Sequence, residues 1–370
     1  MELSYWEYKT WLSNIDFTIV GSGIVGLTTA LQLRKRFPKA KILIIEKGIL
    51  PQGASTKNAG FACFGSASEL LSDLKAHNKE EVLRLVQQRW KGIQELRGLI
   101  GDRTLNFEQN GGHELFLEKD KALFYTCCDK LPMLNKLLLS VFKEEAFNIT
   151  ENKFGFKGVN NSFITQKFEG QIDTGAMMEG LLRLAKKEGV AILNGVSVND
   201  FRNDKEEVIV KTNQLEFKTQ KLFITTNGFV SQLLNENVKP ARAQVLVTKP
   251  IPNLEIKGTF HFDEGYYYFR NVDNRILFGG GRNLDYKAEE TDEFGKTALV
   301  QNELIRLLNE VILPDTNFEL DRSWSGIMGI GNKKKPIIKQ VSDNVFCGVR
   351  LGGMGIAIGS LVGKELAALA

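Results

Sequence analysis

Histidine and cysteine, which often bind metals or act as bases and nucleophiles, are scarce in this sequence. Three histidines and four cysteines are spread over 370 residues, and none shows the paired spacing of a metal site. We therefore expect no metal centre, and a mechanism centred on histidine has little support. The adjacent Cys127 and Cys128 are expected to be reduced helix residues rather than a disulfide.

Long apolar runs and an excess of one charge are also lacking. The longest apolar stretches, 17–20 and 42–45, are far too short to span a membrane. The N-terminus shows no basic region followed by an apolar run, so no signal peptide is visible and we expect a cytoplasmic location. The net charge of +4, from 48 basic and 44 acidic residues, argues against nucleic acid as a partner. Nothing in the composition indicates an oligomeric state.

What the sequence does contain, near its N-terminus, is a strand–helix–strand pattern. Residues 16–20 and 41–46 have the composition of buried strands, and the segment between them places Ile24, Leu27 and Leu31 at helical spacing. A right-handed crossover of this kind makes the two strands parallel in one sheet. The pattern predicts an α/β unit.

A glycine-rich turn, 21–26 (GSGIVG), joins that first strand to its helix. Gly21 permits the tight turn, Gly23 lets the backbone approach a pyrophosphate, and Gly26 lets helix and strand pack closely. The phosphates would lie at the helix N-terminus. Glu46 ends the second strand, where a carboxylate can bind ribose hydroxyls and would repel a 2′-phosphate, which argues against NADP. The turn therefore predicts a dinucleotide site but does not separate NAD from FAD.

The rest of the chain mixes helices with two kinds of strand pattern. Helices are expected at 68–100, 120–147, 175–188, 294–313 and after 355, strands at 104–117, 154–168, 191–198, 208–212, 221–226 and 344–349, and an antiparallel block at 241–281. Because the parallel-type units and the antiparallel block alternate along the chain, we expect two domains built from non-contiguous pieces.

Several further motifs resemble those of one family. They are, in the family's order, 53–60 (GASTKNAG), 170–175 (GQIDTG), 193–198 (LNGVSV), 223–228 (FITTNG), 240–245 (PARAQV), 324–326 (WSG) and 351–356 (LGGMGI). Over nearly its whole length the chain is similar to the FAD-dependent oxidoreductases of the D-amino-acid oxidase superfamily. It most resembles their amine-oxidising branch, which includes glycine oxidase and γ-glutamylputrescine oxidase.

The resemblance implies FAD as the cofactor. It also implies that the bound flavin is dissociable. Relatives that bind FAD covalently do so through a histidine in the segment after Glu46 or through a cysteine near the position of Met328. Here the segment 53–60 has no histidine, and the nearest C-terminal cysteine, Cys347, lies in an expected buried strand. The residues implied to bind FAD are Gly21, Gly23, Ile24, Val25, Gly26, Glu46, Lys47, Ala54, Ser55, Lys57, Asn58, Ala59, Gly60, Val198, Asn227, Gly228, Gly352, Gly353, Met354, Gly355 and Ile356.

The fold implied is α/β with an α+β substrate domain. A Rossmann-type FAD-binding domain would comprise 1–92, 158–235 and 330–370. It would be interleaved with an antiparallel-sheet substrate-binding domain comprising 93–157 and 236–329. The cofactor supplies the difficult chemistry in such enzymes, so no catalytic triad or carboxylate pair is needed.

The sequence departs from the family at one position that concerns the substrate. Amino-acid oxidases of the superfamily carry an arginine that clamps the substrate carboxylate, and Met328 stands at that position here. A methionine cannot pair with a carboxylate. A simple α-amino acid is therefore not the expected substrate, and the amine-oxidising branch, which also lacks the clamp, is the better match.

The resemblance places four candidate substrate residues near the flavin. Tyr266, Tyr268 and Arg270 would share one face of a strand, and Arg350 precedes the last glycine turn. Either arginine could bind an anionic group of the substrate or flavin, or could simply form a structural salt bridge. Lys57 could assist oxygen activation or contact phosphate.

The leading hypothesis is an FAD-dependent oxidase or dehydrogenase that takes a hydride from a CH–NH bond of a small amine or modified amino acid, with oxygen or another acceptor reoxidising the flavin. A 2-hydroxy-acid dehydrogenase is an alternative, although it usually needs a base and no histidine stands in a recognisable place. Further alternatives are an RNA-modifying flavoprotein, for which the lysine run 333–335 is the one candidate basic surface, and a non-catalytic flavin-binding module.

Overall fold

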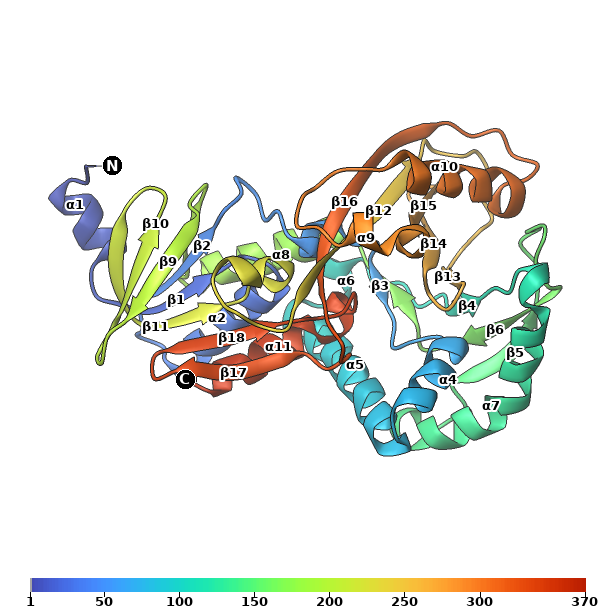
Figure 1. Cartoon of the computed structure of the whole chain (residues 1–370), viewed down its shortest axis with the longest axis horizontal. Coiled ribbons are helices and arrows are strands. Elements are labelled where there is room, and N and C mark those ends of the chain that lie inside the picture. Colours follow the sequence, from blue (N-terminus) through green and yellow to red (C-terminus); the bar gives the residue numbers. More distant parts are fainter. Residues whose placement is uncertain (1) are drawn as a thin grey trace.

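Two large sheets organise the chain in a computed structural model that describes residues 2–370 (Figure 1). The first has the strand order β17-β18-β11-β1-β2-β8, with β10 and β9 continuing antiparallel from β11. Its strands are β1 (Ile15–Val20), β2 (Ile42–Glu46), β8 (Ala191–Asn194), β9 (Val198–Asn203), β10 (Val208–Thr212), β11 (Glu216–Ile224), β17 (Ile337–Ser342) and β18 (Val345–Val349). The pairs β1–β2, β1–β11, β2–β8 and β11–β18 are parallel, which confirms the predicted α/β unit.

The strands of this sheet place apolar side chains alternately on its two faces, and each face packs against its own core. Helices cover one of these faces. Phe17, Ile19 and Ile44 face α2 (Ile24–Arg36) and α11 (Gly355–Ala368), and α5 (Lys79–Ile100) and α8 (Thr174–Lys187) complete that layer. The residues between them, such as Leu43 and Ile45, face the β9–β10 hairpin side. Burial on both faces explains why β1 and β2 are mostly apolar.

The second sheet has the order β16-β12-β15-β14-β13-β4-β6-β5. Its strands are β4 (Gly112–Glu114), β5 (Phe147–Glu151), β6 (Ser162–Gln166), β12 (Lys239–Thr248), β13 (Thr259–Phe262), β14 (Tyr267–Val272), β15 (Arg275–Gly280) and β16 (Leu320–Ile330). Every pairing is antiparallel except β13 with β4. Stacked Phe260 and Phe269 anchor its core beneath α10 (Ala298–Leu307). Strands β12 to β15, which cover 239–280, confirm the antiparallel block predicted at 241–281.

The remaining elements connect or flank these layers. They are α1 (Tyr5–Glu7), η1 (Tyr8–Leu12), α3 (Ala54–Lys57), β3 (Phe61–Ala62), α4 (Ala67–Ala76), α6 (Asp102–Leu105), η2 (Glu118–Asp120), α7 (Lys121–Phe142), β7 (Gly170–Gln171), η3 (Asn227–Gln232), η4 (Arg282–Leu284), α9 (Tyr286–Glu289) and η5 (Leu308–Ile312). No helix within residues 2–370 is long and apolar enough to cross a membrane.

Several predicted elements were wrong in extent or continuity. The strands expected over 104–117 amount to β4, because the segment begins in α6, which ends at the left-handed Asn106 (φ 46°). The helix expected over 120–147 ends at Phe142, where Lys143 is left-handed (φ 65°).

The helix expected over 68–100 is two helices, because Asn78 caps α5 by accepting a hydrogen bond from the Glu81 amide, and the chain turns there. The segment 191–198 is not one strand, because Gly195 has a φ of 72° and separates β8 from β9. The domain boundaries stay a prediction, although β6, within the piece 158–235, pairs in the second sheet.

Candidate functional site

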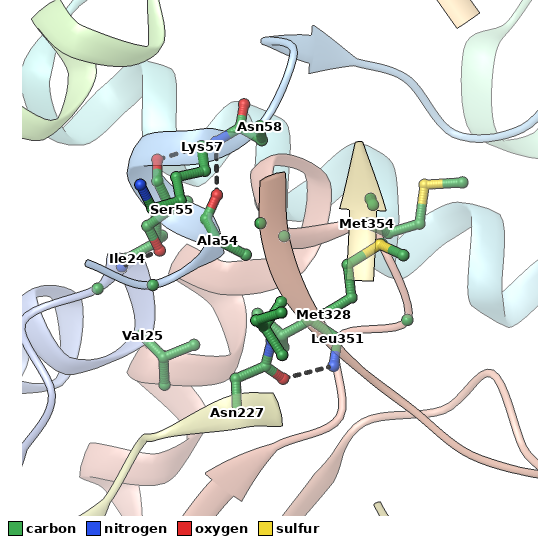
Figure 2. Close-up of a pocket in the computed structure, with 18 of the residues that line it drawn as sticks. Ile24, Val25, Ala54, Ser55, Lys57, Asn58, Asn227, Met328, Leu351 and Met354 are labelled. Carbon is green, nitrogen blue, oxygen red and sulfur yellow. Dashed lines mark hydrogen bonds between the residues drawn. The ribbon is translucent and has the colours of Figure 1, made fainter. Parts of the chain in front are cut away.

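One large cavity of about 1400 Å³ is lined from both sheets (Figure 2). It reaches from the β1–α2 turn to Tyr268 of β14 and Met328 of β16. Nineteen of the residues predicted to bind FAD line it: Gly21, Gly23, Ile24, Val25, Glu46, Lys47, Ala54, Ser55, Lys57, Asn58, Ala59, Gly60, Val198, Asn227, Gly352, Gly353, Met354, Gly355 and Ile356. The other two, Gly26 and Gly228, lie behind this surface, where each permits a close backbone contact. The structure therefore gathers segments far apart in sequence around one space.

The β1–α2 turn leaves no room for side chains behind it. A Cβ on Gly26 would lie 1.9 Å from the carbonyl oxygen of Gly21, so only glycine allows α2 to start this close to β1. Gly21 itself has a φ of 102°. In front, Ser55 Oγ accepts a hydrogen bond of 3.0 Å from the Ile24 amide at the start of α2. The other amides of this helix N-terminus form a cradle suited to a pyrophosphate.

Glu46 is held in place by the turn that it faces. Its Oε2 accepts hydrogen bonds from the Ser22 amide at 2.9 Å and the Ser22 hydroxyl at 2.7 Å. Its Oε1 accepts one from the Gly48 amide at 3.0 Å. The Gln52 amide makes a longer contact of 3.5 Å with the same oxygen. The buried carboxylate lines the cavity, where a ribose hydroxyl can take the place of that long contact.

The segment 53–60 is ordered by Asn58. Its Nδ2 donates to the carbonyl oxygens of Ala54 and Ser55, and its Oδ1 accepts from the Gly60 amide at 2.8 Å and from Thr174 Oγ1 at 2.9 Å (Figure 2). The asparagine thus ties α3 to the start of α8. This arrangement fixes the backbone that lines the middle of the cavity.

A second glycine turn closes the opposite wall. Gly352 and Gly353 have positive φ angles, and Asn227 Oδ1 accepts hydrogen bonds from the Arg350 and Leu351 amides at 3.1 and 3.2 Å. The turn delivers the N-terminus of α11 to the cavity, where its cap residue Met354 supplies no side-chain hydrogen bond. The backbone amides at the N-terminus of α11 are therefore free to face the electron-rich ring edge of a ligand.

The candidate substrate residues do not all reach the cavity. Tyr266 and Tyr268 line it, and burial raises the pKa of Tyr268 to about 12, so that its phenol stays protonated. Arg270 is buried and donates to the carbonyl oxygens of Ala59, Ile172 and Asn271. Arg350 donates to those of Lys335 and Asn237. Neither arginine lines the cavity, so a contact with substrate stays a prediction for both.

Met328 lies where the resemblance placed it, on the cavity wall. Its sulfur is 3.3 Å from where a Cβ on Gly353 would be, so the thioether packs against the second glycine turn. Lys57 also lines the cavity, with its Nζ 5.1 Å from the centre of the Phe294 ring. The cavity wall at Met328 is therefore apolar where the amino-acid oxidases would carry a charge.

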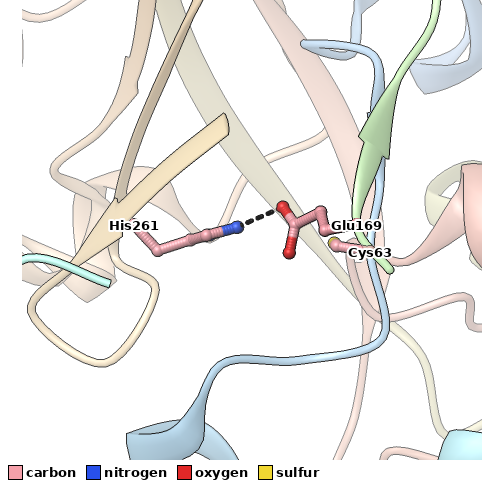
Figure 3. Close-up of side chains that lie close together, drawn as sticks. All are labelled: Cys63, Glu169 and His261. Atoms are coloured by element: carbon pink, nitrogen blue, oxygen red, sulfur yellow. Dashed lines mark hydrogen bonds and ion pairs between the residues drawn. The ribbon is translucent and has the colours of Figure 1, made fainter. Parts of the chain in front are cut away.

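Sequence reasoning missed a buried pair at the substrate end, Glu169 and His261 (Figure 3). His261 Nε2 lies 2.6 Å from Glu169 Oε1, and Glu169 also accepts hydrogen bonds from Thr259 Oγ1 and Gln166 Nε2. Burial alone would lower the pKa of His261, but the charge and hydrogen bond of Glu169 prevail and raise it to about 9. His261 lines the cavity as an imidazolium at neutral pH.

Cys63 lies beside this pair, and the three potential metal-ligand atoms are within 4.8 Å of one another (Figure 3). Burial, followed by the charges of Glu169 and Glu69, raises the pKa of the Cys63 thiol well above its usual value. Since the thiol stays protonated and both oxygens of Glu169 already accept hydrogen bonds, the cluster is satisfied as it stands. That the chain binds no metal remains a prediction.

The Glu169–His261 pair predicts a pH dependence of stability. The folded-state pKa of about 9 lies above the ordinary 6.5, so the stabilisation is complete below pH 6.5 and is lost as pH rises through 9. It should amount to about 3 kcal/mol of unfolding free energy. Chemical denaturation of the protein and of its Glu169→Gln variant between pH 6 and 10 measures this. A difference between the two that does not change with pH would contradict a charged His261.

A second contact missed from the sequence involves the lysine run. Lys334 lines the cavity and pairs at 2.5 Å with Asp73 of α4, whose side chain is 5% exposed. Because Asp73 and Lys334 are separated by most of the chain, no local pattern indicates this pair. The run 333–335 is therefore not only a solvated loop.

The fold and the cavity are those of a dinucleotide-binding protein, with the cavity lined from both sheets. The sequence matches the family described as "FAD dependent oxidoreductase" over residues 16–369, and the chain belongs to that family. It is an FAD-dependent oxidoreductase, as the motifs predicted, and the glycine-rich cradle and the Glu46 carboxylate in the cavity fit that cofactor.

Relatives and solved structures agree with this assignment. The β subunit of sarcosine oxidase from Rhizobium meliloti is 23% identical, with 92% of this chain and 80% of the relative covered. γ-Glutamylputrescine oxidoreductase from Escherichia coli is 22% identical over 96% of this chain and 83% of its own length. Glycine oxidase from Bacillus cereus has the same fold, with a TM-score of 0.76 at 16% identity and 96% of each chain covered. The resemblance to the amine-oxidising branch is thus confirmed.

Proposed function

We propose that this enzyme oxidises a CH–NH bond of a small amine or modified amino acid. The FAD, when bound, accepts the hydride, and oxygen or another acceptor completes the cycle. The relatives that act on such bonds by name, sarcosine oxidase and γ-glutamylputrescine oxidoreductase, support this class. We also propose the cytoplasm as its location, on the sequence alone.

The observation that carries the proposal is the buried ion pair of His261 with Glu169, whose Nε2 and Oε1 atoms lie 2.6 Å apart. A hydroxy acid must lose its hydroxyl proton to a base as the hydride leaves. His77 and His261 both line the cavity. Against the effect of burial, Glu169 raises the pKa of His261 to about 9, which does not suit it as a base at neutral pH, and His77 lies 3.7 Å from Glu81. A neutral amine needs no such base, because its nitrogen lone pair assists departure of the hydride. The cavity therefore favours amines over 2-hydroxy acids.

Apolar and aromatic residues give the substrate end its shape. Phe61 packs edge-on against both His261 and Tyr268, with ring centres 5.1 and 5.6 Å apart. Met328 lines the wall at the position where the amino-acid oxidases of the family carry an arginine. This end offers no clamp from β16 to an α-carboxylate.

Anaerobic mixing of the FAD-loaded protein with matched amines and hydroxy acids tests the proposal. Sarcosine, glycine, proline and putrescine would be compared with glycolate and lactate. We expect at least one amine, and neither hydroxy acid, to bleach the flavin absorbance. Bleaching by lactate or glycolate alone would contradict the proposal, and bleaching by simple α-amino acids alone would show that Met328 was misinterpreted.

A further inference from the structure

The cavity wall contains a buried arginine that forms no ion pair within residues 2–370. Arg89 of α5 is 3% exposed and lines the cavity. Its Nη1 donates a hydrogen bond of 2.7 Å to the carbonyl oxygen of Phe64. Its Nε is buried without a partner, and among residues 2–370 no carboxylate oxygen lies within 4.0 Å of the guanidinium. The charge is thus incompletely satisfied.

Other buried arginines of this chain do not share that condition. Arg270 donates to three carbonyl oxygens and Arg350 to two, although neither forms an ion pair within residues 2–370. The partly exposed Arg242 pairs with Glu289. A buried, unpaired guanidinium destabilises a folded protein, since it loses its hydration without gaining a partner. Such a cost is commonly found at binding sites, where a ligand completes the contacts.

Arg89 lies at the substrate end of the cavity and not at its dinucleotide end. Its positive charge lowers the pKa of the nearby Cys63 thiol, whereas burial and the carboxylates of Glu169 and Glu69 raise that pKa. Cys63 Sγ is in turn 3.9 Å from Met354 Sδ, at the start of α11. The pyrophosphate cradle, at Gly21 and Gly23, lines the same cavity but lies at the start of α2, whereas Arg89 lies within α5.

The arginine is also rigidly positioned. One turn further along α5, a Cβ on Gly92 would lie 2.1 Å from the carbonyl oxygen of Ala357, so α5 is seated directly on α11. Gly65 has a φ of 123°, and a Cβ at that position would lie only 3.2 Å from Arg89 Nη1. Glu69 is the nearby acid, but its Oε2 accepts a hydrogen bond from the Ser66 amide. A fixed donor with free capacity is what an anion site requires.

We propose that Arg89 binds an anionic group of the substrate, a carboxylate or its equivalent. This inference rests on the proposed function and narrows its substrate to an amine that also carries an acid. Arg89 would supply from α5 the charge that Met328 cannot supply from β16. Arg89 and Met328 lie on different walls of the cavity. The acid group of the substrate would therefore be held in a different orientation from the carboxylate of an α-amino acid bound by the family's amino-acid oxidases.

Binding of benzoate to the FAD-loaded protein tests the proposal, with benzamide as the uncharged analogue. Perturbation of the visible flavin absorbance reports binding of either probe without turnover. We expect Arg89→Met to weaken benzoate binding by about 30-fold or more and to leave benzamide binding unchanged. Arg89→Lys should retain part of the benzoate affinity. Arg84→Met, at an exposed position of the same helix, is the matched control and should change neither.

Thermal unfolding separates binding from a structural role. If Arg89 is a ligand-binding residue, Arg89→Met removes an unpaired buried charge and should leave Tm unchanged or raise it. A lowered Tm with unaltered benzoate affinity would overturn the proposal and make the Phe64 contact structural. Unaltered benzoate affinity with a lowered flavin reduction potential would also overturn it, since the charge would then serve the cofactor.

The failure of this inference can be told from failure of the proposed function. If no amine reduces the flavin of the wild-type protein, the proposed function is wrong, regardless of the affinity for benzoate. If an amine reduces the wild-type flavin and Arg89→Met binds benzoate as well as the wild type does, only the inference fails.

Discussion

Replacing Gly26 with alanine is expected to abolish FAD binding. The new Cβ would lie 1.9 Å from the Gly21 carbonyl oxygen and 2.9 Å from Thr225 Oγ1, and backbone atoms cannot yield by that much without moving the turn. The pyrophosphate cradle would be displaced with it. We expect the apparent Kd for FAD to rise by more than about 100-fold, equivalent to about 3 kcal/mol. Fluorescence titration of the apoprotein with FAD measures this.

Gly98→Ala is the matched control for that substitution. Gly98 is exposed in α5, and nothing lies within 4 Å of the position that its Cβ would take. Alanine there should leave FAD affinity unchanged and raise stability by up to about 1 kcal/mol, because glycine is a poor helix former. Full FAD affinity in Gly26→Ala would show that the turn is not the cofactor site.

Glu46→Ala should lower FAD affinity by about 100-fold. The substitution removes an acceptor for the ribose hydroxyls. It also removes the hydrogen bonds that the Ser22 and Gly48 amides donate to the Glu46 carboxylate. Hydrogen bonds to a charged group contribute about 1.5–3 kcal/mol each, so one or two of them account for the loss. Titration of the apoproteins with FAD checks the size of the effect.

FMN gives this prediction an internal control, because it lacks the adenosine half of FAD. If Glu46 binds the adenosine ribose, Glu46→Ala should bind FMN as the wild type does. An equal loss of FMN and FAD affinity would instead mean that the variant has lost the fold of the turn. Unchanged affinity for both would place the ribose elsewhere.

The elements closest to the cofactor could be predicted from the sequence because their signals are local. Strand β1, the turn at Gly21–Gly26 and helix α2 occupy consecutive residues, and burial on both faces of the sheet leaves a mostly apolar run that is easily recognised. The segment 53–60 and the turn at Gly352–Gly353 were found by resemblance to a family. The structure then places both on the cavity wall.

The substrate end could not be predicted because its residues meet only through tertiary packing. Glu169 precedes β7, His261 lies in β13 and Arg89 lies in α5, and none has a neighbour in sequence that marks its role. Arg270 shows what a local pattern leaves undetermined. It shares a face with Tyr268, as period-two alternation predicted, but that face turns its guanidinium to the carbonyl oxygens of Ala59 and Ile172.

The most direct test of the central claim is the anaerobic rate at which an amine reduces the bound flavin. The amine that bleaches the FAD-loaded protein fastest would be compared with the same compound deuterated at the carbon that loses the hydride. The account predicts bleaching by the amine and a markedly slower rate with deuterium. Bleaching by a hydroxy acid, with no reduction by any amine of the panel, would contradict it.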